Sequence, residues 1–171
     1  GTSVKFKADP EIFTETTVYD YEVLLKRLRE QAFLNAGVRI VFSDLRDDDN
    51  IQSEILHYEG GIRQFVEHIH KVKGLDPLSD KVIYVSGSKG DSTAEIALQW
   101  NDSYNEDIRS FANNIHTVDG GTHETGFKNA LTKVINEYGK KFNLIKDNAD
   151  KLIGDDVREG LTAIISVKLT N

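Results

Sequence analysis

Three stretches with helical periodicity alternate with short runs of strand-like sequence along this chain, and this alternation constrains the fold more than any other feature. One helix is predicted to begin after Asp20 and to end by Gly37, with apolar residues three and four positions apart. A second is predicted to follow Gly61, and a third, longer one to follow Gly121. A chain of 171 residues has the length of one domain. The pattern therefore favours a single α+β domain over residues 1–171.

Seven segments carry the alternation of polar and apolar residues that is typical of strands. They cover residues 4–8, 38–45, 51–58, 82–86, 93–100, 108–115 and 162–169. An acidic turn is expected to join the second and third, and a glycine-containing turn the fourth and fifth. The longest helix is predicted to bury one apolar stripe. Its members are Phe127, Leu131, Val134, Ile135 and Tyr138.

The composition excludes several classes of protein. The chain has no cysteine, which rules out a disulfide scaffold and any thiolate metal site. No apolar run approaches the roughly 20 residues of a membrane-spanning helix. The net charge of −7 has the wrong sign for an independent nucleic-acid-binding domain, because such domains neutralise phosphates with Lys and Arg. Since the chain has no methionine and begins at once with strand-like sequence, we expect a segment of a longer, cytoplasmic protein.

The turn that leads into the longest helix is the first candidate site. At Asp119, Gly120, Gly121, Thr122 and His123, free backbone N–H groups and the helix dipole could hold an anion such as phosphate. The same residues are also typical of a plain helix start, in which the glycines turn the chain and Thr122 caps the helix. The plain helix start is the commoner arrangement, and the residues alone leave both open.

Other clusters also have a structural interpretation beside the chemical one. Residues 86–91 lack the spacing of a phosphate-binding loop, so a hairpin turn is favoured. Residues 47–50 lack the ligand spacing of a calcium loop and are interpreted as a solvated turn. Residues 154–160 could hold magnesium or act in acid–base chemistry, but a helix cap with local ion pairs explains the same residues. The five histidines are expected to be structural, so we predict no metal site and no catalytic site.

The most distinctive segment is residues 101–127, NDSYNEDIRSFANNIHTVDGGTHETGF. It resembles the signature block of the ATP-operated subunit of bacterial type IIA DNA topoisomerases. Four further blocks resemble that family in the same order. They are GTSVKFKADPEIF, YEVLLKRLREQAFLNAGVRI, LHYEGGIRQFVEHI and GDDVREGLTAIISVK. The resemblance marks six residues of the signature block: Asn113, Asn114, Gly120, Gly121, Thr122 and His123. The Gly60-Gly61 pair looks more like the gyrase member of this family, gyrase B, than like topoisomerase IV.

This resemblance implies a transducer domain, which relays ATP binding and hydrolysis to DNA capture and passage during negative supercoiling. The implied fold is α+β, a two-layer sheet-and-helix domain of the ribosomal-protein second-domain-like superfamily. Its four-stranded sheet contains a left-handed βαβ crossover, whereas the general rule gives a right-handed one. Because seven strand-like segments exceed four, we expect some of them to form arms or a small second sheet.

The resemblance also implies ATP and magnesium as cofactors of the full-length protein. The family holds them in a preceding domain and with a lysine loop after the last strand, and neither motif is in this sequence. The isolated chain is therefore expected to bind no cofactor and to be inactive. The implied partners are gyrase A, a second copy of gyrase B and double-stranded DNA. Family contacts between copies lie mainly in the preceding domain, so this chain alone is expected to be monomeric.

Three lysines are the DNA-facing candidates. In the family, a basic residue follows the last phenylalanine of the signature block and faces the cavity for transported DNA; here it is Lys128. Lys133 and Lys140 are weaker candidates, and a solvated surface lysine explains Lys128 equally well. Two other functions remain possible: the equivalent domain of topoisomerase IV, and a stand-alone nucleic-acid-binding module of the same fold. The acidic balance counts against the last of these.

Overall fold

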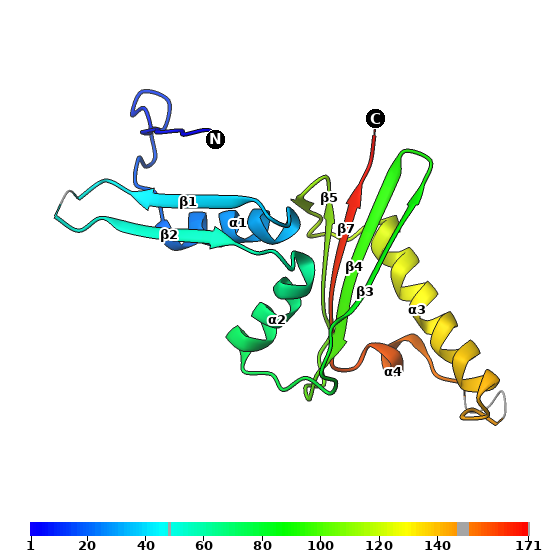
Figure 1. Ribbon diagram of the computed structural model, residues 1–171. Coiled ribbons are helices and arrows are strands. Elements are labelled where there is room, and N and C mark those ends of the chain that lie inside the picture. The colour runs from blue at the N-terminus through cyan, green and yellow to red at the C-terminus, as the bar shows by residue number, and fades with distance from the viewer. Residues whose placement is uncertain (48, 147–150, 171) are drawn as a thin grey trace.

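The computed structural model describes residues 1–47, 49–146 and 151–170, and contains two sheets (Figure 1). In chain order the elements are α1 (Tyr21–Leu34), β1 (Arg39–Asp44), β2 (Gln52–His57), α2 (Ile62–Lys73), β3 (Ile83–Lys89), β4 (Ser92–Trp100), β5 (Asp107–Ala112), β6 (Ile115–His116), α3 (Thr122–Lys141), α4 (Gly154–Arg158) and β7 (Leu161–Lys168). Strands β1 and β2 form a separate antiparallel pair. The main sheet has the order β3-β4-β7-β5-β6. The predicted α+β class is confirmed.

Strand β7 is the centre of the main sheet, antiparallel to β4 and parallel to β5. Its first seven residues are all buried, which is the pattern of a strand covered on both faces. Ile164 packs with Phe65 of α2, whereas Ile165 packs with Phe127 of α3. Figure 1 shows the sheet between these two helices. The expectation of two layers is therefore wrong, because apolar residues on both faces of β7 each require a covering helix.

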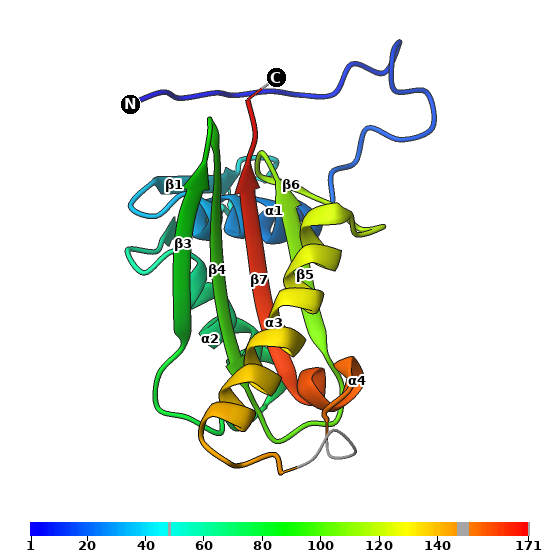
Figure 2. The same ribbon diagram turned by 90° about the vertical axis from the view of Figure 1, so that its right-hand side faces the viewer.

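The path from β5 to β7 is visible in Figure 2, where α3 lies in front of the sheet. Both strands point upward in this view, and β7 lies to the left of β5. The chain turns at the top through β6, runs down along α3 and enters β7 from below through α4. The long helix thus connects two parallel neighbours in the sheet.

Helix α1 and the β1–β2 hairpin form a smaller unit beside the main sheet (Figure 1). The Asp20 carboxylate accepts a hydrogen bond from the Val23 N–H at 3.1 Å, so Asp20 is the helix cap that the sequence predicts. The helix ends at Leu34, before Gly37, which has a φ of +80°. Leu25 and other buried residues of α1 pack on Leu56 of β2. Arms or a small second sheet were expected, and this hairpin is such a sheet.

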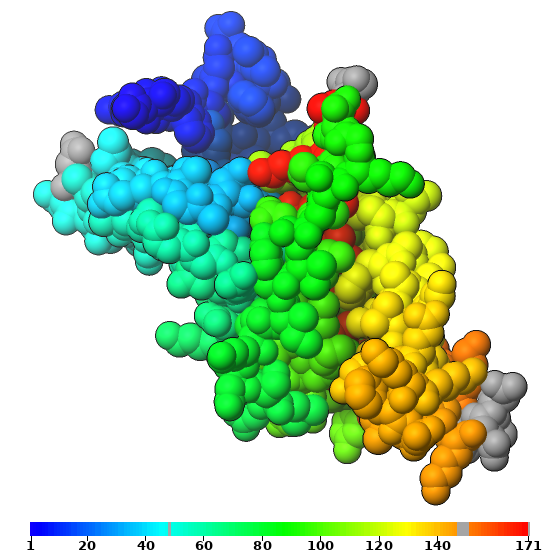
Figure 3. All heavy atoms as spheres, turned by 45° about the vertical axis from the view of Figure 1, so that its right-hand side comes forward, coloured from blue at the N-terminus to red at the C-terminus, as the bar shows by residue number. Residues whose placement is uncertain are grey.

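Two expectations about apolar segments are wrong. Residues 4–8 form no strand; Val4 and Phe6 are 76% and 63% exposed, in an arm that stands away from the body of the molecule (Figure 3). Alternation alone makes no strand where no neighbouring strand is available for pairing. On α3, Phe127 is buried, but Val134 and Tyr138 are more than half exposed because the C-terminal half of the helix diverges from the sheet (Figure 1). Among the described residues, no helix could span a membrane.

Candidate nucleic-acid interface

The signature segment brings β5 and the start of α3 together through a chain of hydrogen bonds. The Ser110 hydroxyl lies 2.7 Å from the Thr117 hydroxyl and donates to the Glu124 carboxylate at 2.7 Å. Thr117 Oγ1 also lies 3.1 Å from His123 Nε2 and donates to the Ser110 carbonyl at 2.9 Å. Side chains far from one another in the strand–loop–helix sequence therefore form one polar cluster.

The start of α3 is a glycine turn without a side-chain cap. Gly120 has a φ of +74°, a left-handed conformation that glycine adopts readily, and Gly121 is the residue at the N-cap. Thr122 is the first helical residue, so the expectation that it caps the helix is wrong. Burial by itself would raise the pKa of Glu124, but hydrogen bonds from Ser110 and Lys128 lower it. A carboxylate therefore already occupies the helix start, which disfavours an anion site there.

Lys128 lies between two carboxylates. Its Nζ is 3.0 Å from Glu124 Oε1 and 3.2 Å from Glu106 Oε1, and the Lys128 side chain is 26% exposed. Burial tends to lower the pKa of Lys128, but these two carboxylates raise it above the ordinary value. Lys128 is thus charged and partly accessible, with its charge compensated locally.

Glu106 is a residue that the sequence did not single out. It lies in the loop between β4 and β5, and its second carboxylate oxygen accepts from Arg158 Nε at 2.6 Å. It therefore connects Lys128 on α3 with Arg158 on α4. No motif spacing indicates this contact, because it joins residues 52 positions apart.

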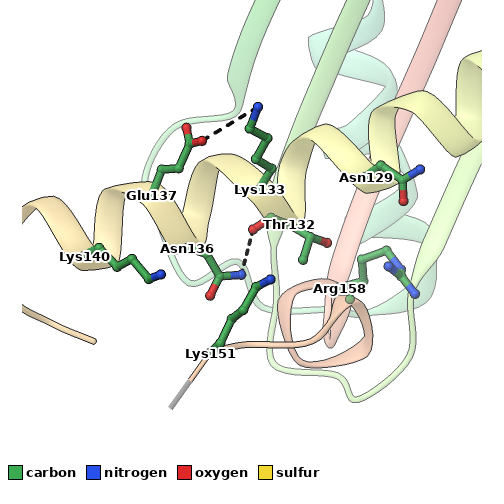
Figure 4. Close-up of a pocket in the computed structure, with 9 residues that line it drawn as sticks. Asn129, Thr132, Lys133, Asn136, Glu137, Lys140, Lys151 and Arg158 are labelled. Carbon is green, nitrogen blue, oxygen red and sulfur yellow. Dashed lines mark hydrogen bonds and ion pairs between the residues drawn. The ribbon is translucent and has the colours of Figure 1, made fainter. Parts of the chain in front are cut away.

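Lys133 and Lys140 lie apart from Lys128, on another face of α3. They are seven residues apart, close to two helical turns, so they share a face. Both line an open cavity of about 420 Å³ between α3 and the segment before and within α4 (Figure 4). Lys151 and Arg158 also line it, together with Glu137, which pairs with Lys133 at 3.8 Å. Among the described residues, the wall of this cavity has four cationic side chains and one carboxylate.

The buried amide of Asn136 holds one wall of this cavity in place. Its Nδ2 donates to the Thr132 carbonyl and the Leu152 carbonyl, both at 2.9 Å. Its Oδ1 accepts from the Leu152 N–H at 3.0 Å. The segment next to Lys151 is thereby tied to α3.

Asn113 and Asn114 form the turn between β5 and β6, at the opposite end of the sheet from α4 (Figure 2). They lie apart from the three lysines, so the six marked residues and the DNA-facing candidates do not form one site, although Lys128 joins the polar cluster of Ser110 through Glu124. His123 belongs to the polar cluster of Ser110, and the Gly120 N–H donates to the Thr117 carbonyl at 2.9 Å beside it. Gly121 is the N-cap of α3.

The clusters at residues 47–50, 86–91 and 154–160 fit the structural interpretation rather than the chemical one. The 86–91 segment forms the end of the β3–β4 hairpin, and Asp47 accepts from the Asp49 N–H, although Asp48 lies outside the described residues. Asp156 accepts from the Ile153 N–H at 2.8 Å, and Asp155 pairs with Arg158, which confirms the cap with local ion pairs. Within the described ranges, no three His, Asp or Glu side chains could hold a metal ion.

Comparisons with known proteins decide the family. The family model described as DNA gyrase B matches residues 61–171. The chain is also 52% identical over 168 residues to DNA gyrase B of Staphylococcus aureus, and equally to that of Staphylococcus epidermidis. The chain belongs to the DNA gyrase B family. The alignment covers 98% of this chain but only 26% of each of these gyrase B proteins, so the chain spans about a quarter of their length.

Solved structures of gyrase B have the same fold. The 43K ATPase domain of Thermus thermophilus gyrase B, in complex with an aminocoumarin, superimposes with a TM-score of 0.80 at 38% identity, over 95% of this chain and 43% of that one. The ATP-binding domain of Francisella tularensis topoisomerase IV reaches 0.71 at 26% identity, over 92% and 40%. Since topoisomerase IV shares the fold, sequence rather than architecture assigns the chain to gyrase B.

Proposed function

We propose that residues 1–171 are the transducer domain of a gyrase B protein, which relays ATP binding and hydrolysis to DNA capture and passage during negative supercoiling. The observation that carries this proposal is the 52% identity to gyrase B along almost the whole chain. The structural match supports it further, because this chain aligns with only 43% of a gyrase B ATPase-domain structure. The rest of that structure leaves room for a separate nucleotide-binding part. The relay is a two-state movement that the bound nucleotide biases.

The finer fold assignment is also a proposal. We infer a fold of the ribosomal-protein second-domain-like superfamily with a left-handed βαβ crossover. The arrangement in Figure 2 supports it: with α3 in front and both strands upward, the chain passes from β5 to a parallel neighbour on its left. A right-handed connection would place the second strand on the right. The implied sheet has four strands; the main sheet here has four strands of six or more residues, and its fifth strand, β6, has two residues.

The partners and cofactors follow from the family. In the complete gyrase B we propose ATP and magnesium as cofactors, gyrase A and a second copy of gyrase B as partners, and double-stranded DNA as substrate, in the cytoplasm. The residues of this chain contribute no magnesium ligands in that proposal. Its own contribution is the DNA-facing surface and the mechanical connection between nucleotide and DNA.

Supercoiling of relaxed plasmid tests the proposal directly. The complete gyrase B, combined with gyrase A and ATP, is expected to introduce negative supercoils. Relaxation or decatenation with ATP but without supercoiling would instead assign the chain to topoisomerase IV. If ATP had no effect on DNA topology, the relay itself would be refuted.

Lys128, Lys133 and Lys140 are the proposed phosphate contacts of this domain. Lys133 and Lys140 share the cationic cavity of Figure 4, which supports them, although Lys133 pairs with Glu137 there. Lys128 pairs with Glu106 and Glu124. Each phosphate contact that is lost should reduce the slope of log K against log salt by about one. The complete gyrase B with Lys133→Gln and Lys140→Gln should therefore bind duplex DNA with a slope about two units shallower. The Lys5→Gln, Lys7→Gln pair is the charge-matched control. If both pairs changed the salt slope equally, the cavity would be excluded as the DNA contact.

A further inference from the structure

The turn between β5 and β6 carries asparagine at both central positions, and both have positive φ, +48° at Asn113 and +65° at Asn114. The ladder closes with Ala112 opposite Ile115, so the loop has two residues and the geometry of a tight hairpin. Glycine adopts such angles at least as easily as asparagine. The turn alone therefore does not require either side chain, and both are engaged elsewhere.

Asn113 holds the end of β7. Its Oδ1 accepts from the Leu169 N–H at 2.8 Å, and its Nδ2 donates to the Leu169 carbonyl at 3.1 Å. Leu169 lies beyond the last paired residues of β7, which are Val167 against β5 and Lys168 against β4. The side-chain amide of Asn113 thus replaces a backbone amide and continues the ladder past the end of the strand.

Asn114 holds the C-terminal end of α1. Its backbone carbonyl accepts from Gln31 Nε2 at 2.9 Å, and its Nδ2 donates to Asn35 Oδ1 at 3.1 Å. Asn35 is the C-cap of α1 and donates from its own amide to the Gln31 carbonyl at 2.8 Å. Helix α1 in turn packs on the β1–β2 hairpin. One two-residue turn therefore joins the smaller unit to the end of the central strand.

We propose that Asn113 is a positioning residue, which fixes the direction in which the chain leaves β7, and that Asn114 couples this direction to α1 and its hairpin. The inference rests on the proposed relay function. A movement of the α1 unit relative to the main sheet would pull on the turn and, through the Asn113 amide, on the backbone at Leu169. Besides this turn, the two bodies are connected by the short segment from β2 to α2 and by side-chain packing of Phe33 on α2 and β7.

Glycine substitution separates the side-chain contacts from the backbone conformation. Asn113→Gly keeps the positive φ and removes only the two bonds to Leu169, and Asn114→Gly removes only the side-chain bond to Asn35. Asn143→Gly is the matched control, because Asn143 also has a positive φ, +56°, but follows α3 at the other end of the sheet (Figure 2). Each variant is placed in the complete gyrase B and combined with gyrase A.

The decisive quantity is the number of strand passages for each ATP hydrolysed. Asn113→Gly is expected to retain ATP hydrolysis but to lower this ratio about fivefold or more, the usual size of a coupling between sites. Asn114→Gly should lower it in the same direction, and Asn143→Gly should leave it unchanged. An unchanged ratio in Asn113→Gly would overturn the proposal. If the wild-type protein showed no ATP-dependent change in DNA topology, the proposed function would fail instead.

Hydrogen exchange in the 171-residue chain gives a second test that is independent of activity. Loss of the two bonds should raise exchange of the Leu169 amide about tenfold, while Ile164 in the middle of β7 keeps its protection. This local change distinguishes a released strand end from general unfolding. If Asn113→Gly unfolds the complete gyrase B, or if Leu169 exchange does not change, the positioning role is refuted.

Discussion

Replacement of Gly160 by alanine should destabilise this fold more than replacement of any glycine with open space around it. Gly160 has a φ of +67°, and a Cβ there would lie 2.6 Å from both the Asn101 and the Ser103 carbonyl oxygens. These are backbone atoms, so no side chain can rotate away to relieve the contact. Gly74 is the matched control, because it has nearly the same φ, +64°, and nothing within 4 Å of its Cβ position.

The expected magnitudes follow from these two environments. A left-handed alanine costs about 1–2 kcal/mol, and this cost applies at both positions. At Gly160 the Cβ also has to displace the 101–103 loop, for which overpacking costs of about 1–3 kcal/mol are typical. The loop resists, because the Asn101 N–H donates to the Gly160 carbonyl at 2.8 Å and Asn101 Nδ2 donates to Thr162 Oγ1 at 3.1 Å. We expect a loss of about 2–5 kcal/mol for Gly160→Ala and about 1–2 kcal/mol for Gly74→Ala.

Urea unfolding followed by tryptophan fluorescence measures both variants. Trp100 is the only tryptophan, and its indole N–H donates to the Val157 carbonyl at 3.0 Å, so its emission reports on the affected region. The urea midpoint should shift while the denaturant slope stays constant, which is the signature of a change in stability alone. If Gly160→Ala were no less stable than Gly74→Ala, the carbonyl contacts would not be rigid, and the reasoning would be refuted.

Two further predictions concern protonation and ligands. Burial lowers the pKa of both His68 and His70, and positively charged side chains near His68 lower its pKa further. Below the ordinary histidine pKa of about 6.5, the unfolded chain therefore binds more protons than the folded chain. The stability that depends on these histidines should be fully present above that pH and should fall as the pH is lowered below it. The His68→Gln, His70→Gln double variant should flatten this part of the pH profile of unfolding. Calorimetric titration with a non-hydrolysable ATP analogue should give no heat of binding to this chain. Micromolar affinity would contradict the placement of the nucleotide site in the preceding domain.

Sequence periodicity predicted most elements of the fold because local patterns determine them. Asp20 caps α1 as expected, and the paired glycines precede α2 and α3. The same pattern failed at residues 4–8, because a strand also needs a partner, which no local pattern supplies. It failed again at Tyr138, whose exposure depends on how far α3 extends along the sheet.

The candidate site was predicted less completely, because its contacts join distant parts of the chain. The resemblance singled out Lys128 but not Glu106, which contacts it from a loop 22 residues earlier. The resemblance marked Asn113, but only the three-dimensional path of β7 reveals its partner, Leu169, 56 residues later. Local sequence contains the propensities of such residues and not their partners.

The partners of Lys128 explain how one lysine can stabilise the fold and still bind DNA as proposed. A phosphate that approaches Lys128 competes with Glu106 and Glu124 for the ammonium group. A carboxylate left without a partner would make this change of partner unfavourable. Each carboxylate, however, has a second donor: Glu106 keeps Arg158, and Glu124 keeps Ser110. When Lys128 turns to a phosphate, Glu106 therefore keeps a charged partner, whereas Glu124 keeps only a hydrogen bond from a neutral hydroxyl. We expect the two acids to lower the affinity of Lys128 for a single phosphate, so the proposed binding of duplex DNA should require several cations together.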